Sequence, residues 1–255
     1  MQDSITDIVW VKIAPLIPVK ATKVGRPRSN QRKVLEAIMF IIRTGMQWRY
    51  LPREYGAPTT IHGIYMQWCR TGVCGAIFEV AKMAYCSLQG VSNWYAIDTS
   101  SKKAPLALFS GKNPTDRAKR GIKQIVIVDR KGAPVAVGVA AANVHDSKLL
   151  EPMLKNCFPT KDPYILASDS AWDAEKLRKI CAKKNSALIA ATNRRRNKNT
   201  NKVTPPMRWL VERTIGWFSW QRGLKICWVK LPIVYLGFLH LAAASQLFKM
   251  SGIFG

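Results

Sequence analysis

The chain is short of acidic residues. It holds 15 Asp and Glu against 40 Lys and Arg among 255 residues, which gives a formal net charge of +25 and a pI near 10.2. A folded chain this cationic usually binds a polyanion, and nucleic acid is the first candidate. A ribosomal protein and a protein of the membrane surface are the alternatives. Because 48% of the residues are hydrophobic, the chain can bury a core and is no disordered basic tail.

Metal-binding cysteine pairs and long apolar runs are also absent. The six cysteines form no Cys-x-x-Cys pair and the three histidines lie far from ligand spacings, which argues against zinc and favours reduced, buried thiols in a cytoplasmic protein. No basic and then apolar leader opens the sequence, and no apolar run reaches 18 residues. The most apolar segment, 231–247, is interrupted by Pro232, Gly237 and His240, so we expect a buried helix and no membrane partner.

Residues 1–90 show helical periodicity throughout and predict an all-α domain. An apolar stripe over residues 34–42 stops at Gly45, and a further helix is expected from about residue 60 to 70. A helix, a turn and a second helix in this order indicate a helix-turn-helix-like unit, with His62, Tyr65 and Gln67 as candidate readers of base edges. Two helices that only pack on each other are the alternative.

The periodicity changes near residue 90, so residues 91–255 predict an α/β domain. Strands are expected at 95–98, at 164–169 and at 187–191, and a long β-hairpin at 122–128 and 134–142 around the turn 129–132. Asp146 is a candidate cap for a helix over 149–154, and further helices are expected over 173–184 and around Glu212.

Two of these strands end directly in an acid. Asp98 closes the first strand and Asp169 closes the strand at 164–169. The carboxyl ends of parallel strands are where ligands bind in a sheet covered by helices, so adjacent strands would bring both carboxylates together. Carboxylates this close repel each other unless a cation lies between them. Turn formation or helix capping is the alternative explanation for each acid alone.

Glu212 is the only acidic residue after Glu175. The basic residues around it favour its ionised form and would also suit phosphate. Three hard oxygen ligands of this kind suit Mg²⁺ or Mn²⁺ rather than zinc. Two such ions, ~3.5–4 Å apart, could activate water and stabilise the leaving oxygen of a phosphodiester. The neighbouring cations are Arg194, Arg195, Arg196, Lys198, Lys202, Arg208 and Arg213.

Three segments that contain these acids resemble the acidic motifs of DDE transposases. They are IDTS at 97–100, LASDSAWD at 166–173 and RWLVERT at 208–214. The first domain is similar to the N-terminal helical DNA-binding region of the bacterial insertion-sequence group commonly numbered five, on the segments at 10–16, 25–28, 43–52 and 55–56. The resemblance covers nearly the whole chain, in order.

The resemblance implies a ribonuclease-H-like mixed sheet with helices on both faces, preceded by the helix-turn-helix-like domain. It implies that Asp98, Asp169 and Glu212 are the catalytic residues and hold two Mg²⁺ or Mn²⁺ ions. The implied activity is binding of terminal inverted repeats, strand cleavage and strand transfer by a homo-oligomer on double-stranded DNA in the bacterial cytoplasm. A stand-alone nuclease with the same core and a decayed, non-catalytic DNA-binding protein are the alternatives.

Several basic residues are candidate DNA contacts. An extended arm with Arg26 and Arg28 could enter a minor groove, and the polar loop that follows residue 192 could contact phosphates. The resemblance implies phosphate contacts for Arg213 and Arg222. A basic linker and solvated surface are the alternatives. The candidates are Arg26, Arg28, Arg194, Arg195, Arg196, Lys198, Arg213 and Arg222.

Two further features flank the acids. Gly216 lies one helical turn after Glu212 and could admit a DNA backbone or serve helix packing. One of the nearby tryptophans is a candidate to stack on an unpaired base, and the other three are expected in the core. These tryptophans are Trp172, Trp209, Trp217 and Trp220.

Overall fold

The computed structural model describes residues 5–18, 29–155, 162–192 and 204–253. Residue contacts divide the chain into two compact units. The helical unit comprises 1–89, 219–226 and 233–255, and the α/β unit comprises 90–218 and 227–232. The chain leaves its first unit after residue 89 and returns to it at residues 219–226 and 233–255. The predicted division put all of 91–255 into one domain.

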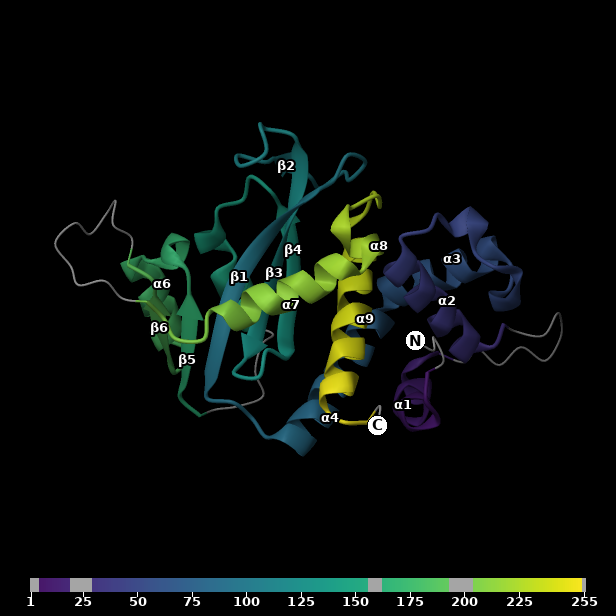
Figure 1. Ribbon diagram of the computed structural model, residues 1–255, viewed down its shortest axis with the longest axis horizontal. Helices are drawn as coiled ribbons and strands as arrows, with labels where there is room; N and C mark the ends of the chain where they lie inside the picture. Colours follow the sequence, from purple (N-terminus) through teal and green to yellow (C-terminus); the bar gives the residue numbers. More distant parts are fainter. Residues whose placement is uncertain (1–4, 19–28, 156–161, 193–203, 254–255) are drawn as a thin grey trace. The chain divides into compact units, whose positions relative to one another are not determined.

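The helical unit is built mainly from amphipathic helices. Its α-helices are α1 (Asp7–Ile13), α2 (Gln31–Thr44), α3 (Pro58–Thr71), α4 (Val73–Gln89), α8 (Arg222–Lys225) and α9 (Pro232–Met250) (Figure 1). The side chain of Asn30 caps α2 by accepting from the N–H groups of Arg32 and Lys33. Gly45 ends α2 at φ 66°, a left-handed conformation that glycine adopts without strain. The predicted stripe and its end at Gly45 are confirmed.

The last helix, α9, explains why the C-terminal end joins the helical unit. It is apolar on most of its surface, and 11 of its residues are buried, among them Phe238 and Leu241. It is also the one helix in the described part of the chain whose length and composition would allow it to cross a membrane.

Tyr65 of α3 stacks on Phe238, with ring centroids 4.9 Å apart, and its hydroxyl donates to the Val234 carbonyl at 2.6 Å.

Tyr65 is therefore a core residue, and its interpretation as a base reader is wrong. Its side chain is fully buried and its only polar atom is already bonded. His62 packs edge-to-face on Trp48 at 5.1 Å, and Gln67 is exposed on α3. The sequence periodicity did not distinguish the buried from the exposed side of α3 because its partner, α9, lies far away in the chain.

The α/β unit contains a six-stranded mixed sheet. Its strands are β1 (Trp94–Lys103), β2 (Gly111–Lys112), β3 (Arg120–Asp129), β4 (Pro134–Ala141), β5 (Tyr164–Ser168) and β6 (Ser186–Ala190). They are ordered β2-β3-β1-β5-β6, with β4 paired to β3. β3 is antiparallel to β1 and β4, whereas β1, β5 and β6 run parallel. The expected mixed sheet, the hairpin and the strands at 164–169 and 187–191 are confirmed, but the strand expected at 95–98 continues to Lys103.

Helices cover both faces of this sheet. Alternate residues such as Ile97 and Ile127 pack with Leu150 and Leu177 on the face of α5 (Leu150–Lys155) and α6 (Glu175–Ala182). The other helix, α7 (Trp209–Trp220), crosses the opposite face (Figure 1). Because side chains alternate along β1, Asp98 points to the face of α7 and its neighbours point to the other.

The segment after β4 differs from the expectation. The 3₁₀ turn η4 (Asp146–Lys148) precedes α5, and its cap is His145, whose ring Nδ1 accepts from the Ser147 N–H. Asp146 does not cap the helix as predicted, because its carboxylate bonds to Lys123 and Thr99 instead.

Candidate active site

Asp98 lies where β1 passes from the buried core to the partly exposed end of the sheet. Its Oδ1 accepts from the Thr99 N–H at 2.7 Å. Burial raises the pKa of the Asp98 carboxyl to about 6, and the negative charges of Asp169 and Glu212 add to this rise. The Thr99 N–H and the Arg208 guanidinium oppose it. Asp98 is thus a buried carboxyl, and the nearby Arg208 offsets only part of the effect of its burial.

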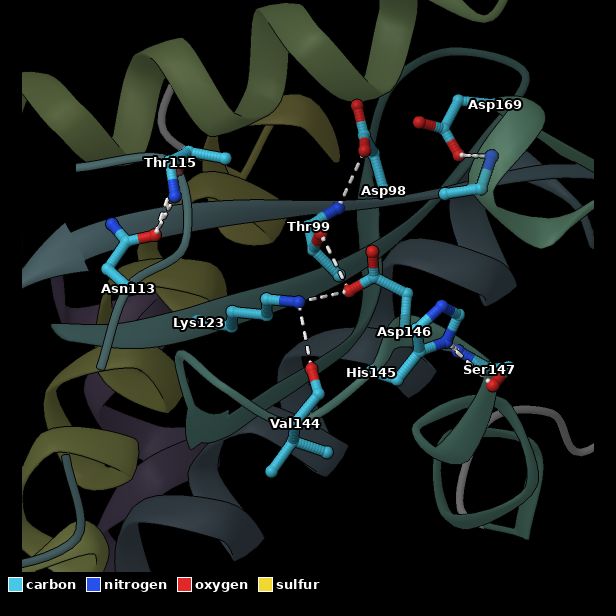
Figure 2. A network of polar contacts seen from close by, with 11 residues as sticks. Asp98, Thr99, Asn113, Thr115, Lys123, Val144, His145, Asp146, Ser147 and Asp169 are labelled. Atoms are coloured by element: carbon cyan, nitrogen blue, oxygen red, sulfur yellow. Dashed lines mark hydrogen bonds and ion pairs between the residues drawn. The ribbon is translucent and has the colours of Figure 1, made fainter. Parts of the chain in front are cut away.

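Asp169 directly follows β5 and starts the 3₁₀ turn η5 (Ser170–Trp172), where its Oδ1 accepts from the Ala171 N–H at 3.1 Å. β1 and β5 are adjacent parallel strands with Ala96 opposite Ala167. Asp98 and Asp169 each lie two residues beyond that pair, so they stand at the same edge of the sheet (Figure 2). Asp169 also caps this turn, whereas Asp98 does not close its strand as predicted, because β1 continues to Lys103.

Burial also raises the pKa of Asp169. The negative charges of Asp146 and Glu212 strengthen this rise, whereas the Ala171 N–H and Arg208 act against it. Two neighbouring carboxyls with raised pKa values are typical of functional sites, because burial and like charges make them receptive to a cation.

Glu212 comes from the first turn of α7 and is about half exposed. Arg208, one turn earlier, donates from Nη2 to the Glu212 Oε1 at 2.5 Å. The other guanidinium nitrogen, Nη1, lies 3.8 Å from the Asp98 Oδ2. Arg208 therefore links Glu212 to Asp98 and supplies part of the missing positive charge. Its spacing of four residues from Glu212 was the available sequence signal for this contact.

The donor chemistry of these acids fits a hard divalent cation, since all three offer carboxylate oxygens. Within the described residues, however, no three Asp, Glu, His or Cys side chains are grouped closely enough to hold a metal ion. The structure thus brings Asp98, Asp169 and Glu212 to one region, with Arg208 between two of them, but not into one coordination sphere.

Two family models match the chain. One, described as "Putative transposase of IS4/5 family", matches residues 5–78. The other, described as "Transposase DDE domain", matches residues 92–247, more than half of the chain. The chain belongs to the DDE transposases.

Curated relatives of this transposase include two proteins from Burkholderia cepacia. One is described as "Putative transposase for insertion sequence element IS402"; it is 29% identical over 140 residues, which are 52% of this chain and 65% of that protein. The other, "Insertion element IS402 uncharacterized 16.2 kDa protein", is 32% identical over 108 residues, 39% of this chain and 73% of that protein. The chain spans just under two thirds of the length of the first relative.

Solved structures similar to this transposase include the Mos1 strand transfer complex, with a TM-score of 0.29, 9% identity and coverage of 92% of this chain and 81% of that chain. The mariner Mos1 paired end complex with Mg has a TM-score of 0.29, 10% identity and coverage of 92% and 82%. Scores this low support no inference from those structures to this chain.

Asp146 is a residue of the transposase that the sequence motifs did not reveal as part of this region. Its Oδ1 accepts from the Thr99 hydroxyl at 3.2 Å and from Lys123 Nζ at 2.8 Å, and its charge acts on Asp169 (Figure 2). It was missed because it begins the 3₁₀ turn η4 and does not directly follow a strand. An acid a few residues after the second hairpin strand was the only local signal.

The tryptophans near the acids are less buried than expected. Trp172 is fully buried, but Trp209 is 56% and Trp220 84% exposed, so the expectation of three core tryptophans is wrong. The Arg213 guanidinium lies over the rings of Trp209 and Trp217, at 5.0 and 4.7 Å from their centroids, and donates to the Lys131 carbonyl at 2.7 Å. The local sequence of α7 does not show which of its sides faces the solvent.

The predicted DNA contacts are only partly within the described residues. Arg26, Arg28, Arg194, Arg195, Arg196 and Lys198 lie outside them. Arg213 contacts the two tryptophan rings and the Lys131 carbonyl, and Arg222 lies on α8 in the helical unit. The phosphate contacts of both residues stay predictions. A side-chain carbon added at Gly216 would meet no described atom within 4 Å. Helix packing therefore does not explain this glycine.

Proposed function

We propose that this transposase cleaves DNA strands at the terminal inverted repeats of its insertion sequence and joins the freed ends to target DNA, with Mg²⁺ or Mn²⁺. The observation that carries the proposal is the placement of Asp98 and Asp169 at the same edge of adjacent parallel strands. The negative charge of Glu212, on α7, raises the pKa of both carboxyls.

Asp98, Asp169 and Glu212 are the residues that would hold the divalent ions. When bound, two such ions would supply an activated water and charge stabilisation for the leaving oxygen. Asp98 and Asp169 are held by backbone N–H groups, which fix their orientation at the sheet edge. Glu212, which is about half exposed on α7, would orient the attacking water.

The chemistry needs no covalent protein–DNA intermediate. Water attacks the phosphorus at the element end and the bond to the 3′ oxygen breaks, which leaves a 3′ hydroxyl and a 5′ phosphate. The 3′ hydroxyl then attacks a phosphorus of the target strand and displaces its 3′ oxygen. One arrangement of carboxylates can serve both steps, because each is a displacement at phosphorus by a hydroxyl group.

The partners that follow are double-stranded DNA, at element ends and target, and further copies of the chain on that DNA. The net charge of +25 supports a polyanionic partner.

The test is cleavage of a labelled inverted-repeat end by wild type, Asp98→Asn, Asp169→Asn and Glu212→Gln. Each substitution removes one charge with little change of shape, so we expect loss of Mg²⁺-dependent cleavage by at least 100-fold and unchanged end binding in a gel-shift assay. Glu151→Gln, at an exposed acid of α5, is the matched control and should cleave as wild type does. Mg²⁺-dependent cleavage at the wild-type rate in any of the three refutes the role of that residue.

The two alternatives give different results in the same assay extended to a target plasmid. A stand-alone nuclease would cut the end but never join it to the plasmid. A non-catalytic DNA-binding protein would bind the end with a steep salt dependence and cut nothing at any metal concentration. The proposal requires joined product that disappears in the Asp98→Asn protein.

A further inference from the structure

A buried ion pair lies next to the candidate site on the opposite face of the sheet. Asp146 and Lys123 are joined at 2.8 Å, and their side chains are only 19% and 12% exposed. Lys123 makes a second bond, to the Val144 carbonyl at 2.8 Å. Asp146 Oδ1 also accepts from the Thr99 hydroxyl at 3.2 Å (Figure 2). Removing one partner of a buried pair is costly, so this arrangement resists rearrangement.

Thr99 connects this pair to Asp98. Because side chains alternate along β1, the Thr99 hydroxyl points to the face of α5, whereas Asp98 points to the face of α7. The backbone N–H of Thr99 nonetheless donates to the Asp98 Oδ1 at 2.7 Å. Thr99 is therefore held on one side by Asp146 and holds Asp98 on the other.

The negative charge of Asp146 also reaches Asp169. Lys123 is the one cation that the described residues place in direct contact with Asp146, and its Nζ is shared with a carbonyl oxygen. Lys123 therefore neutralises the charge of Asp146 only in part, and the remainder acts on Asp169 beside Asp98. A negative charge near a cation site raises the affinity of the site for cations.

We propose that Asp146 is a positioning residue of the site. It fixes Asp98 through Thr99, and its charge strengthens the binding of a divalent cation by Asp98 and Asp169. This inference rests on the proposed function, since it presumes that these two acids bind the cation. Residues that orient metal ligands typically contribute about 10–100-fold to metal affinity. If Asp146 served only to tie the hairpin to η4, its loss would lower stability and leave the metal affinity unchanged.

The test is calorimetric titration of the DNA-free full chain with Mn²⁺, below the melting temperature of every variant. Thr99→Val removes the hydroxyl but keeps the N–H that bonds Asp98, and we expect about 10-fold weaker Mn²⁺ binding. Asp146→Asn keeps an acceptor for Thr99 but loses the charge, and Asp146→Ala loses both. We expect the alanine variant to bind Mn²⁺ most weakly of the three.

Two variants serve as controls. Thr99→Ser keeps the hydroxyl and should restore wild-type binding. Glu151→Gln removes an equal charge from an exposed position of α5 and should leave the affinity within twofold of wild type. A readout without metal is amide exchange, in which the Thr99 N–H should exchange at least 10-fold faster in Asp146→Ala.

Wild-type Mn²⁺ affinity in both Asp146→Ala and Thr99→Val overturns the inference and leaves the proposed function standing. If wild type binds Mn²⁺ no more tightly than Asp98→Asn does, the proposed metal site itself fails and the positioning role falls with it. The two failures are distinguished by the Asp98→Asn titration. If Asp146→Ala does not fold, Thr99→Val decides, because it changes a single partly exposed side chain on β1.

Discussion

At the scale of single residues, the site combines buried carboxyls with little positive charge between them. Asp98 and Asp169 both have raised pKa values, chiefly because they are buried. Arg208 is the cation that acts on both of them and pairs with Glu212. A protein whose net charge is +25 thus leaves Asp98 and Asp169 incompletely neutralised. A divalent cation would relieve this repulsion, which a single arginine does only in part.

The first prediction concerns stability and pH. The folded-state pKa of Asp98, about 6, is above its usual value of 3.8, so the folded protein favours the protonated form. The protonated Asp98 contributes fully below pH 3.8, and this contribution is lost as the pH rises through about 6. Asp98→Asn should therefore raise the free energy of unfolding at pH 7.5 by on the order of 2 kcal/mol and change it little near pH 4. Urea unfolding at both pH values measures this, and an equal effect at both would contradict it.

The second prediction concerns Arg208. Its removal takes a positive charge away from the cation site, so Arg208→Gln should bind Mn²⁺ several-fold more tightly than wild type in the absence of DNA. The same change should raise the pKa of Asp98 and Asp169 further, because Arg208 now lowers both. Calorimetry at low ionic strength gives the affinity, with Arg208→Lys as the control that keeps the charge. Weaker binding in Arg208→Gln than in Arg208→Lys would show that Arg208 supports the site in another way.

At the scale of elements, α7 is held on the sheet by its contact with the turn between β3 and β4. The Thr214 hydroxyl donates to the Gly132 carbonyl at 2.7 Å, and the Arg213 guanidinium donates to the neighbouring Lys131 carbonyl. Thr214 is fully buried, and it lies two residues from Glu212. The position of Glu212 over the sheet edge therefore depends on this hairpin turn.

The third prediction tests this docking. Thr214→Val leaves a buried carbonyl without its donor, which typically costs about 1–3 kcal/mol. We expect that loss in urea unfolding, together with reduced end cleavage at saturating Mg²⁺, because Glu212 loses its fixed position. Thr214→Ser keeps the hydroxyl and should recover most of both quantities. Full cleavage activity in a destabilised Thr214→Val protein would show that Glu212 does not need this contact of α7 with the hairpin turn.

The elements themselves were largely predictable from sequence. The hairpin of β3 and β4, the strand β5 and the helix α6 follow from local periodicity, and the acid after β5 marked the site directly. Several distant side-chain contacts were not predictable. Tyr65 was misplaced because α9 buries it, and Asp146 was missed because its partners Lys123 and Thr99 belong to other strands. Whether α9 joins one unit or the other depends on such contacts, which a single sequence does not display.

At the scale of the whole molecule, two units share one chain that leaves the helical unit near residue 90 and returns to it at residue 219. The family model of the transposase DDE domain matches residues 92–247, which include parts of both units. The family definition by sequence therefore does not coincide with the compact units. Truncation after residue 218 would remove α8 and α9 from the helical unit, although the three acids would remain.

The fourth prediction follows from the charge of the whole chain. If many of its 40 basic residues contact phosphates, the logarithm of the DNA-binding constant should fall linearly with the logarithm of the salt concentration. A slope of magnitude about 5 or more is expected, because each phosphate contact contributes about 0.9. Fluorescence anisotropy between 50 and 300 mM KCl, at ~20-fold excess of end DNA over any competitor, measures it. A slope near zero would exclude an extended phosphate-binding surface.

The most direct test of the central claim is a change of metal preference. Asp98→Cys and Asp169→Cys replace a hard oxygen ligand by a softer thiolate, which Mg²⁺ binds poorly and Mn²⁺ tolerates better. If these acids hold the ion that drives cleavage, both variants should be inactive with Mg²⁺ and regain measurable cleavage of the labelled end with Mn²⁺, whereas the Asn variants regain none. Wild-type cleavage with Mg²⁺ in either Cys variant would contradict a metal-holding role for Asp98 and Asp169.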